Sequence, residues 1–264
     1  MLKRIISAIV MAAVIASIIL YAPKMIYDGI VLLIVMGGLY EFFNLVLPSS
    51  SIYKETGWIF GAAVAASVIF GKNPYIFMAT LIGGSFVVFL IYMKHSSVLE
   101  GVTAKTGLTL LGAVYIGATI PFFSLLRDLS HGKALVFMGI ACAAMSDTFA
   151  LFGGKLFGKH KFAPLTSPNK TMEGFVAGFV GSLFAAYVVK LIGWHELPIL
   201  HVVIVGLLIG FIGPYGDLIE SLIKRDCHVK DSGSLIPGHS GILDRLDALI
   251  FTAPVLYLYA RLFL

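Results

Sequence analysis

Long apolar runs separated by short polar segments recur from one end of this chain to the other. A helix needs about 20 mainly apolar residues to cross a bilayer, although shorter spans occur. Nine runs approach or meet this length: 5–22, 26–47, 57–71, 74–93, 107–126, 134–152, 174–192, 198–214 and 246–264. The runs do not alternate with the period of two that a membrane strand requires. The pattern predicts an all-α, polytopic membrane helix bundle of about nine transmembrane helices.

The first and third runs are less regular than the others. Run 5–22 follows two basic residues, as in a signal peptide, but no clear cleavage site comes after it, so we expect a spanning helix. Run 57–71 is short, and it suits either a full span or a partial, re-entrant segment.

Composition agrees with a membrane protein and argues against several other classes. Hydrophobic residues make up 59% of the chain and charged residues only 12%, whereas a soluble domain has about 25% charged residues. Cys142 and Cys227 provide neither a disulfide framework nor the spacing of a metal site. Basic residues interleaved with aromatics do not form a stripe, so we expect no nucleic-acid partner.

The charged residues concentrate in the second half of the chain. We divide the chain into N-terminal transmembrane helices (1–133) and a C-terminal transmembrane region (134–264) with two polar motif segments, 146–174 and 213–247. Under the nine-span pattern, 13 of the 19 Lys and Arg residues share one side with the N-terminus, and eight of those 13 lie in the motif segments. The positive-inside rule then predicts a multi-pass protein of the inner membrane whose motif segments face the cytosol.

The segment 213–247 is the most densely charged part of the chain. It begins with three residues that permit a helix break or a close approach of a ligand to the backbone: Gly213, Pro214 and Gly216. Four polar residues follow at helical spacing: Asp217, Glu220, Ser221 and Lys224. A helix places these four on one face. Ion-rich sequence between spans indicates a binding or catalytic site, and a solvated helix end with local ion pairs is the alternative.

The rest of this segment combines a glycine-rich stretch with two carboxylates. Backbone amides of such a stretch can approach phosphate oxygens, and His239 within it suits phosphate binding, proton relay or a role in the loop itself. Asp244 and Asp247 flank Arg245 at the start of the last run. Paired carboxylates are ligands that hard cations such as Mg²⁺ prefer. Capping of the last helix is the alternative for either one.

The segment 146–174 carries a second set of candidates. Asp147 lies inside an apolar run, where an unpaired carboxylate costs about 3 kcal/mol on insertion scales. It is therefore a site candidate, with a helix-to-helix hydrogen bond as the alternative. The donors of residues 167–171 come just before Glu173 and a new run, where a helix N-terminus can hold phosphate. The lysines of this segment also suit contact with anionic lipid headgroups.

These motifs together resemble the phosphatidate cytidylyltransferase family, also called CDP-diacylglycerol synthase. That family's pattern has Ser, Lys-Arg, Lys-Asp, a Leu-Ile-Pro-Gly-His-Gly-Gly stretch and Asp-Arg-x-Asp. The matching residues here are Ser221, Lys224, Arg225, Lys230, Asp231, Pro237, Gly238, His239, Gly241, Asp244, Arg245 and Asp247. The resemblance spans at least residues 146–247. Ser240 stands where the family usually has Gly, and Gly154-Lys155 where relatives often have Gly-Arg.

The resemblance implies a nucleotidyltransferase of phospholipid biosynthesis that uses CTP and phosphatidic acid at the membrane. On this basis the catalytic, charge-neutralising set is Lys224, Arg225, Lys230, Asp231, His239 and Arg245. The substrate-positioning set is Ser167, Asn169, Lys170 and Ser221. The metal set is Asp217 and Asp244, helped by Asp231 or Asp247, with Asp147 and Glu173 as further partners. We expect Mg²⁺ as the cofactor, and a second metal or a monovalent cation stays open.

Two other interpretations are weaker. An ion- or proton-coupled transporter would use Asp147, Asp217 and Asp244 as coupling sites, but the charges gather on one face and no inverted repeat is visible. The CDP-alcohol phosphotransferases also act on CDP-lipids, but their pattern of spaced aspartates is not found in this sequence. A homodimer is plausible for such a bundle, since glycine pairs permit close helix contact.

Overall fold

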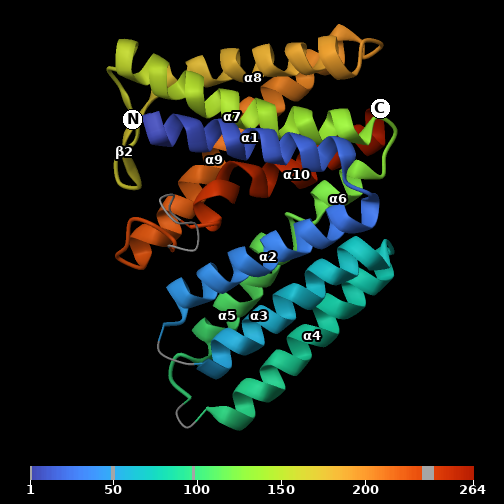
Figure 1. Ribbon diagram of the computed structural model, residues 1–264. Coiled ribbons are helices and arrows are strands. Elements are labelled where there is room, and N and C mark those ends of the chain that lie inside the picture. The colour runs from blue at the N-terminus through green and yellow to red at the C-terminus, as the bar shows by residue number, and fades with distance from the viewer. Residues whose placement is uncertain (1, 49–50, 97–98, 234–240) are drawn as a thin grey trace.

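The computed structural model describes residues 2–48, 51–96, 99–233 and 241–264, and these are almost entirely helical (Figure 1). The helices are α1 (Leu2–Tyr21), α2 (Lys24–Val46), α3 (Ser51–Ala66), α4 (Pro74–His95), α5 (Val102–Gly112), α6 (Phe122–Arg127), α7 (Gly132–Phe157), α8 (Met172–Gly193), α9 (Ile199–Asp226) and α10 (Leu243–Phe263). Two π-helical turns, η1 (Ser67–Gly71) and η2 (Ala113–Ala118), extend α3 and α5. The predicted all-α bundle is confirmed.

Seven helical segments in the described part of the chain are long and apolar enough to span a membrane. They are α2, α4, the continuous stretch Val102–Arg127, α7, α8, α9 and α10. The two remaining predicted runs correspond to α1, which is apolar over Val10–Tyr21, and to α3 with its extension η1. The expectation of about nine helices therefore agrees with the structure, and the chain is a multi-pass membrane protein.

Helix α9 is longer than the sequence predicted. The apolar run ends at residue 214, but the helix continues through Pro214 without a break and ends at Asp226. Gly216 does not break the helix. Its role is in packing, because a Cβ at this position would lie only 2.4 Å from the backbone oxygen of Asp247. The glycine thus lets α9 lie directly against α10, and the charged face of α9 reaches the start of α10.

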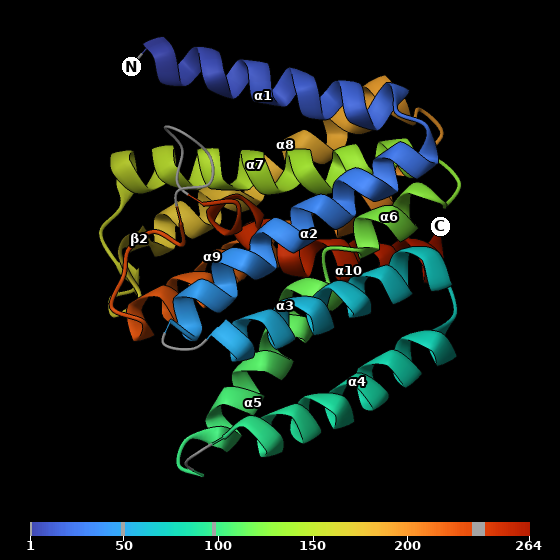
Figure 2. The ribbon, with the colours of Figure 1, turned by 60° about the horizontal axis from the view of Figure 1, so that its bottom comes forward.

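Helices α7 and α8 form the most extensive helix pair of the bundle (Figures 1 and 2). Small residues bring the two backbones together. A Cβ on Gly174 would meet the carbonyl oxygen of Ala150 at 2.7 Å, and one on Gly181 would meet that of Met145 at 2.4 Å. In lipid, where apolar side chains gain little from leaving the solvent, such close van der Waals contact is a main source of helix association.

A short antiparallel hairpin joins α7 to α8, and the sequence analysis did not predict it. Strand β1 (Lys161–Ala163) pairs with β2 (Ser167–Thr171), with Lys161 opposite Thr171. The hairpin lies outside the apolar runs, where backbone groups that no helix satisfies can also meet water. Thr171 ends β2 and caps α8, accepting a hydrogen bond from the Gly174 amide at 3.1 Å.

An ion network ties α2 to the α6 region of the fold. Asp28 is buried in α2 and accepts hydrogen bonds from Lys24 and from Ser124 of α6. Lys24 also pairs with Asp128 at 3.3 Å, and Lys72 reaches the other oxygen of Asp128 at 2.8 Å. The hydrogen bond to Asp128 raises the pKa of the Lys72 ammonium. The buried carboxylate of Asp28 is therefore compensated.

We predict that Gly181→Ala destabilises the bundle, because the added methyl group would push α8 away from the backbone of α7. Overpacking of this kind costs about 1–3 kcal/mol, and thermal unfolding in detergent measures it. Gly83→Ala in α4 is the matched control, since nothing lies within 4 Å of its Cβ position. An equal or smaller loss for Gly181→Ala than for the control would contradict the packing described above.

Candidate functional site

The charged face of α9 forms as its spacing predicted, and Lys224 connects it to α10. The Lys224 ammonium lies 2.8 Å from a carboxylate oxygen of Glu220, one turn earlier on α9, and 2.6 Å from Oδ1 of Asp244 on α10. Glu220 is completely buried and Lys224 nearly so. The ion pair therefore lies between the two helices rather than at a solvated helix end.

Asp244 organises the described ends of the glycine-rich segment. Its Oδ2 accepts hydrogen bonds from the Ser232 amide at 3.1 Å, the Ser232 hydroxyl at 3.0 Å and the Gly241 amide at 2.9 Å. Its Oδ1 accepts from Lys224. Both carboxylate oxygens are thus engaged by the protein. Asp244 lies in the first turn of α10, and these bonds connect the helix to the segment before it rather than cap the helix's own amides.

Glu41 of α2 belongs to the same cluster, and the sequence analysis missed it. This residue is only 3% exposed. Its Oε2 accepts hydrogen bonds from the Ser232 hydroxyl at 3.2 Å and the Leu243 amide at 2.9 Å. A Cβ on Gly241 would lie 2.3 Å from that oxygen, so glycine is needed for the close approach. The available signal was a carboxylate inside an apolar run, the same signal that singled out Asp147.

The two motif segments meet through Lys170 and Asp217. Lys170 extends from β2 and its ammonium lies 2.7 Å from Oδ2 of Asp217 and 3.3 Å from the carbonyl oxygen of Pro214. Ser221 donates to the other oxygen of Asp217 at 3.2 Å. The hairpin therefore contacts α9 at Asp217, which lies about two helical turns before Lys224.

Three carboxylates from three helices face a common region. Asp147 of α7, Asp217 of α9 and Asp247 of α10 lie close enough for their negative charges to repel one another. Asp147 is exposed and Asp247 half-buried, with Oδ1 of Asp247 accepting from the Ala248 amide at 2.7 Å. A cation would relieve this repulsion, and carboxylate oxygens suit a hard divalent ion. Within the described ranges, His, Cys, Asp and Glu side chains do not converge in threes as tightly as a metal shell.

Glu173 has contacts of a different kind. Its carboxylate accepts from the Lys159 amide at 3.0 Å and faces the His160 ring nitrogen Nδ1 at 2.6 Å. These partners belong to the chain between α7 and β1. The contacts found for Glu173 thus tie the hairpin to α8, whereas the sequence grouped it with the metal set.

The remaining predicted site residues are spread around this cluster. The exposed ones are Asn169, Arg225, Lys230, Asp231 and Arg245. Ser167 is half-buried in β2, and Arg225 donates to the Val229 carbonyl oxygen at 3.1 Å. His239 lies outside the described residues, as do Pro237, Gly238 and Ser240 of the motif.

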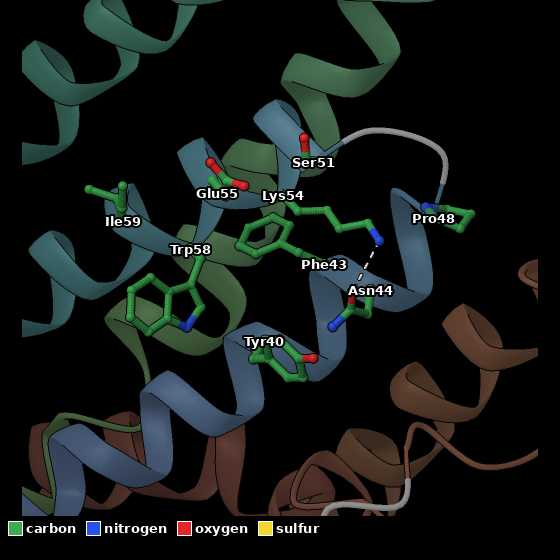
Figure 3. Close-up of a pocket in the computed structure, with 9 residues that line it drawn as sticks. All are labelled: Tyr40, Phe43, Asn44, Pro48, Ser51, Lys54, Glu55, Trp58 and Ile59. Atoms are coloured by element: carbon green, nitrogen blue, oxygen red, sulfur yellow. Dashed lines mark hydrogen bonds between the residues drawn. The ribbon is translucent and has the colours of Figure 1, made fainter.

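A cavity of about 570 Å³ between α2 and α3 does not include any member of this cluster (Figure 3). Figure 3 shows Trp58 and Ile59 on one side and Tyr40 beside Asn44, whose side-chain oxygen accepts a hydrogen bond from Lys54 at 3.0 Å. This cavity therefore lies apart from the place where the charged groups converge. The charged cluster, which joins α2, α7, α9, α10 and the hairpin, is the candidate functional site.

Comparison with known proteins adds independent information. The model of the cytidylyltransferase family matches residues 2–263. A Bacillus subtilis (strain 168) protein named phosphatidate cytidylyltransferase is 39% identical over 160 residues, which are 60% of each chain. An Arabidopsis thaliana protein, phosphatidate cytidylyltransferase 5, chloroplastic, is 44% identical over 132 residues, 50% of this chain and 33% of its own. The match thus spans about three fifths or less of the length of these relatives.

We predict that Glu41→Ala loosens the start of α10, because the Leu243 amide loses its acceptor and the Ser232 hydroxyl keeps only Asp244. A buried donor left without a partner costs about 1–3 kcal/mol, so amide hydrogen exchange at Leu243 should accelerate about tenfold or more. Hydrogen exchange with mass spectrometry measures this. Glu55→Ala in α3 is the control, since Glu55 is exposed. Unchanged exchange at Leu243 in Glu41→Ala would exclude the anchoring role.

Proposed function

Because the chain belongs to the cytidylyltransferase family, we propose that it transfers a cytidylyl group from CTP to phosphatidic acid and forms CDP-diacylglycerol and pyrophosphate. The observation that carries the proposal is the convergence of Lys170, Lys224 and a group of carboxylates from four helices and the hairpin. The relatives that the chain matches over part of their length are named phosphatidate cytidylyltransferase.

The chemistry makes little demand on a general base. An oxygen of the lipid phosphate attacks the α-phosphorus of CTP, the bond from the α-phosphorus to the bridging oxygen breaks, and pyrophosphate leaves with that oxygen. A phosphate monoester has a second pKa near 6, so the nucleophile is largely dianionic at pH 7. The difficulty is to bring two polyanions together and to stabilise the departing charge.

The cations of the cluster answer this difficulty. Lys224 is fixed between Glu220 and Asp244, and Lys170 is fixed by Asp217. Ammonium groups held in this way need no further ordering when phosphates arrive, and this preorganisation is what electrostatic catalysis requires. Arg225 and Lys230, exposed just after Lys224 in the chain, would add neutralising charge, and Arg245 is exposed in the first turn of α10.

Asp217 of α9, with Asp147 of α7 and Asp247 of α10, would hold Mg²⁺, because carboxylate oxygens from these adjacent helices are the ligands that a hard divalent ion prefers. A bound Mg²⁺ would neutralise triphosphate charge and stabilise the leaving pyrophosphate. The sequence assigned Asp244 to this role together with Asp217. Since both oxygens of Asp244 already accept hydrogen bonds from the protein, we now assign Asp244 to positioning Lys224 and the glycine-rich segment.

The membrane context follows from the charge distribution. The excess of basic residues on one side supports a position of the cluster at the cytosolic face of the inner membrane, where CTP is available. A second copy of the chain remains an expectation from the sequence alone.

Pyrophosphate release by the detergent-purified protein tests the function. We expect release only when CTP, phosphatidic acid and Mg²⁺ are all present, with CDP-diacylglycerol in the lipid phase, because the reaction needs both substrates and a counter-charge. Each component is omitted in turn. Release without phosphatidic acid would indicate simple CTP hydrolysis, and no release from a folded sample would remove the proposal.

We predict that Asp217→Asn lowers kcat/KM by about 100-fold or more, because it weakens the hold on Lys170 and removes one charge from the proposed cation site. Steady-state kinetics at varied Mg²⁺ measures this, and thermal unfolding checks that the variant is folded. Asp226→Asn is the control, since Asp226 is exposed at the end of the same helix. Equal activity of the two variants would refute the assignment of Asp217.

A further inference from the structure

An apolar groove of about 380 Å³ runs between α1, α2, α7 and α10. Its walls are aliphatic and aromatic side chains, including Ile15 of α1, Ile34 of α2, Ile140 of α7 and Leu249 of α10. The one charged residue among those that line it is Arg245. The groove is thus an apolar space inside a membrane protein with a guanidinium on its wall.

The groove is closed at one end and open at the other. Ile19, near the end of α1, is only 2% exposed, whereas Ile15 and Met11 are each 36% exposed. Lys133 of α7 donates to the Leu20 carbonyl oxygen at 2.6 Å and fastens the closed end. Helix α1 therefore separates from the bundle toward its N-terminal half, as Figure 2 shows.

The open end of the groove coincides with the start of α10. Helices α1 and α2 are consecutive and antiparallel (Figures 1 and 2), so the N-terminal half of α1 lies toward the same end as the C-terminal half of α2. On α10 the groove extends from Ile242 to Leu249, so Arg245 lies toward its open end and is exposed there. The groove thus opens where Asp244, the neighbour of Arg245, pairs with Lys224.

We propose that this groove binds an acyl chain of the phosphatidic acid substrate, with the lipid phosphate beside Arg245. The proposal rests on the function proposed above and adds the place of the lipid. Phosphatidic acid has an anionic phosphate joined to apolar chains, and the groove offers an apolar channel with a cation at its mouth. Arginine recognises phosphate well because its planar fork can form two parallel hydrogen bonds.

Helix α10 would then separate the two substrates. Asp244 and Asp247 face the charged cluster, while Ile242, Arg245 and Leu249 line the groove. The lipid phosphate would reach the nucleotide around the first turn of α10. The cavity in Figure 3 is a poorer candidate, because Lys54, Asn44 and Glu55 line it and it lies apart from the cluster.

The test compares two lipid substrates in one protein. Ile140→Trp would fill the middle of the groove without touching the charged cluster. We expect KM for dioleoyl phosphatidic acid to rise about tenfold, as for loss of about two buried methylene groups, while the kinetics with dihexanoyl phosphatidic acid change less than about twofold. Leu249→Trp, which lines the groove from α10, should do the same. Ile59→Trp, in the cavity of Figure 3, is the control and should affect neither substrate.

An equal loss with both lipids in the two groove variants, or no loss with either, would overturn the proposal. A second measurement does not depend on turnover: phosphatidic acid with a photoreactive diazirine on its acyl chain is irradiated with the wild-type protein, and labelled peptides are mapped. We expect labels in α1 and α10, reduced by excess phosphatidic acid but not by phosphatidylcholine. Equal competition by both lipids would indicate a structural lipid and refute a substrate groove. Specific labelling without any CTP-dependent reaction would instead place the failure in the proposed function.

Discussion

The buried ammonium of Lys224 is the interaction on which the charged end of the bundle depends. Taking an ion out of water costs several kcal/mol unless partners compensate it, and Lys224 has two, Glu220 on its own helix and Asp244 on α10. Asp244 in turn accepts hydrogen bonds from the backbone amides of Ser232 and Gly241. One charge therefore fixes the spacing of α9 and α10 and the described ends of the segment between them.

The cluster as a whole carries more negative than positive charge. Glu220 and Asp244 pair with the single ammonium of Lys224, and Glu41 is linked to Asp244 through Ser232. Asp147, Asp217 and Asp247 are a second group of carboxylates, with Lys170 paired to Asp217. An excess of carboxylates opposes the approach of a polyanion unless cations intervene. This imbalance is the physical reason for expecting that a divalent ion accompanies the nucleotide.

Sequence reasoning could predict features that depend on local spacing. The apolar runs predicted the helices because length and hydropathy are properties of consecutive residues, and the spacing from Asp217 to Lys224 predicted one helix face. It could not predict that Glu41 joins the cluster, because that contact connects residues about 200 positions apart. It also allowed a break at Pro214, whereas α9 continues through that residue as one helix to Asp226.

The glycine seam between α7 and α8 limits which sequences this fold can accept. A side chain added at Gly174 or Gly181 would meet a backbone oxygen of α7, at 2.7 Å and 2.4 Å from the respective Cβ positions. Backbone cannot rotate aside as a side chain can, so a methyl and a hydroxymethyl group are excluded for the same reason. The seam therefore selects residues by volume and is indifferent to their polarity. In a bilayer, where polarity usually decides what a helix position tolerates, these positions obey a purely geometric rule.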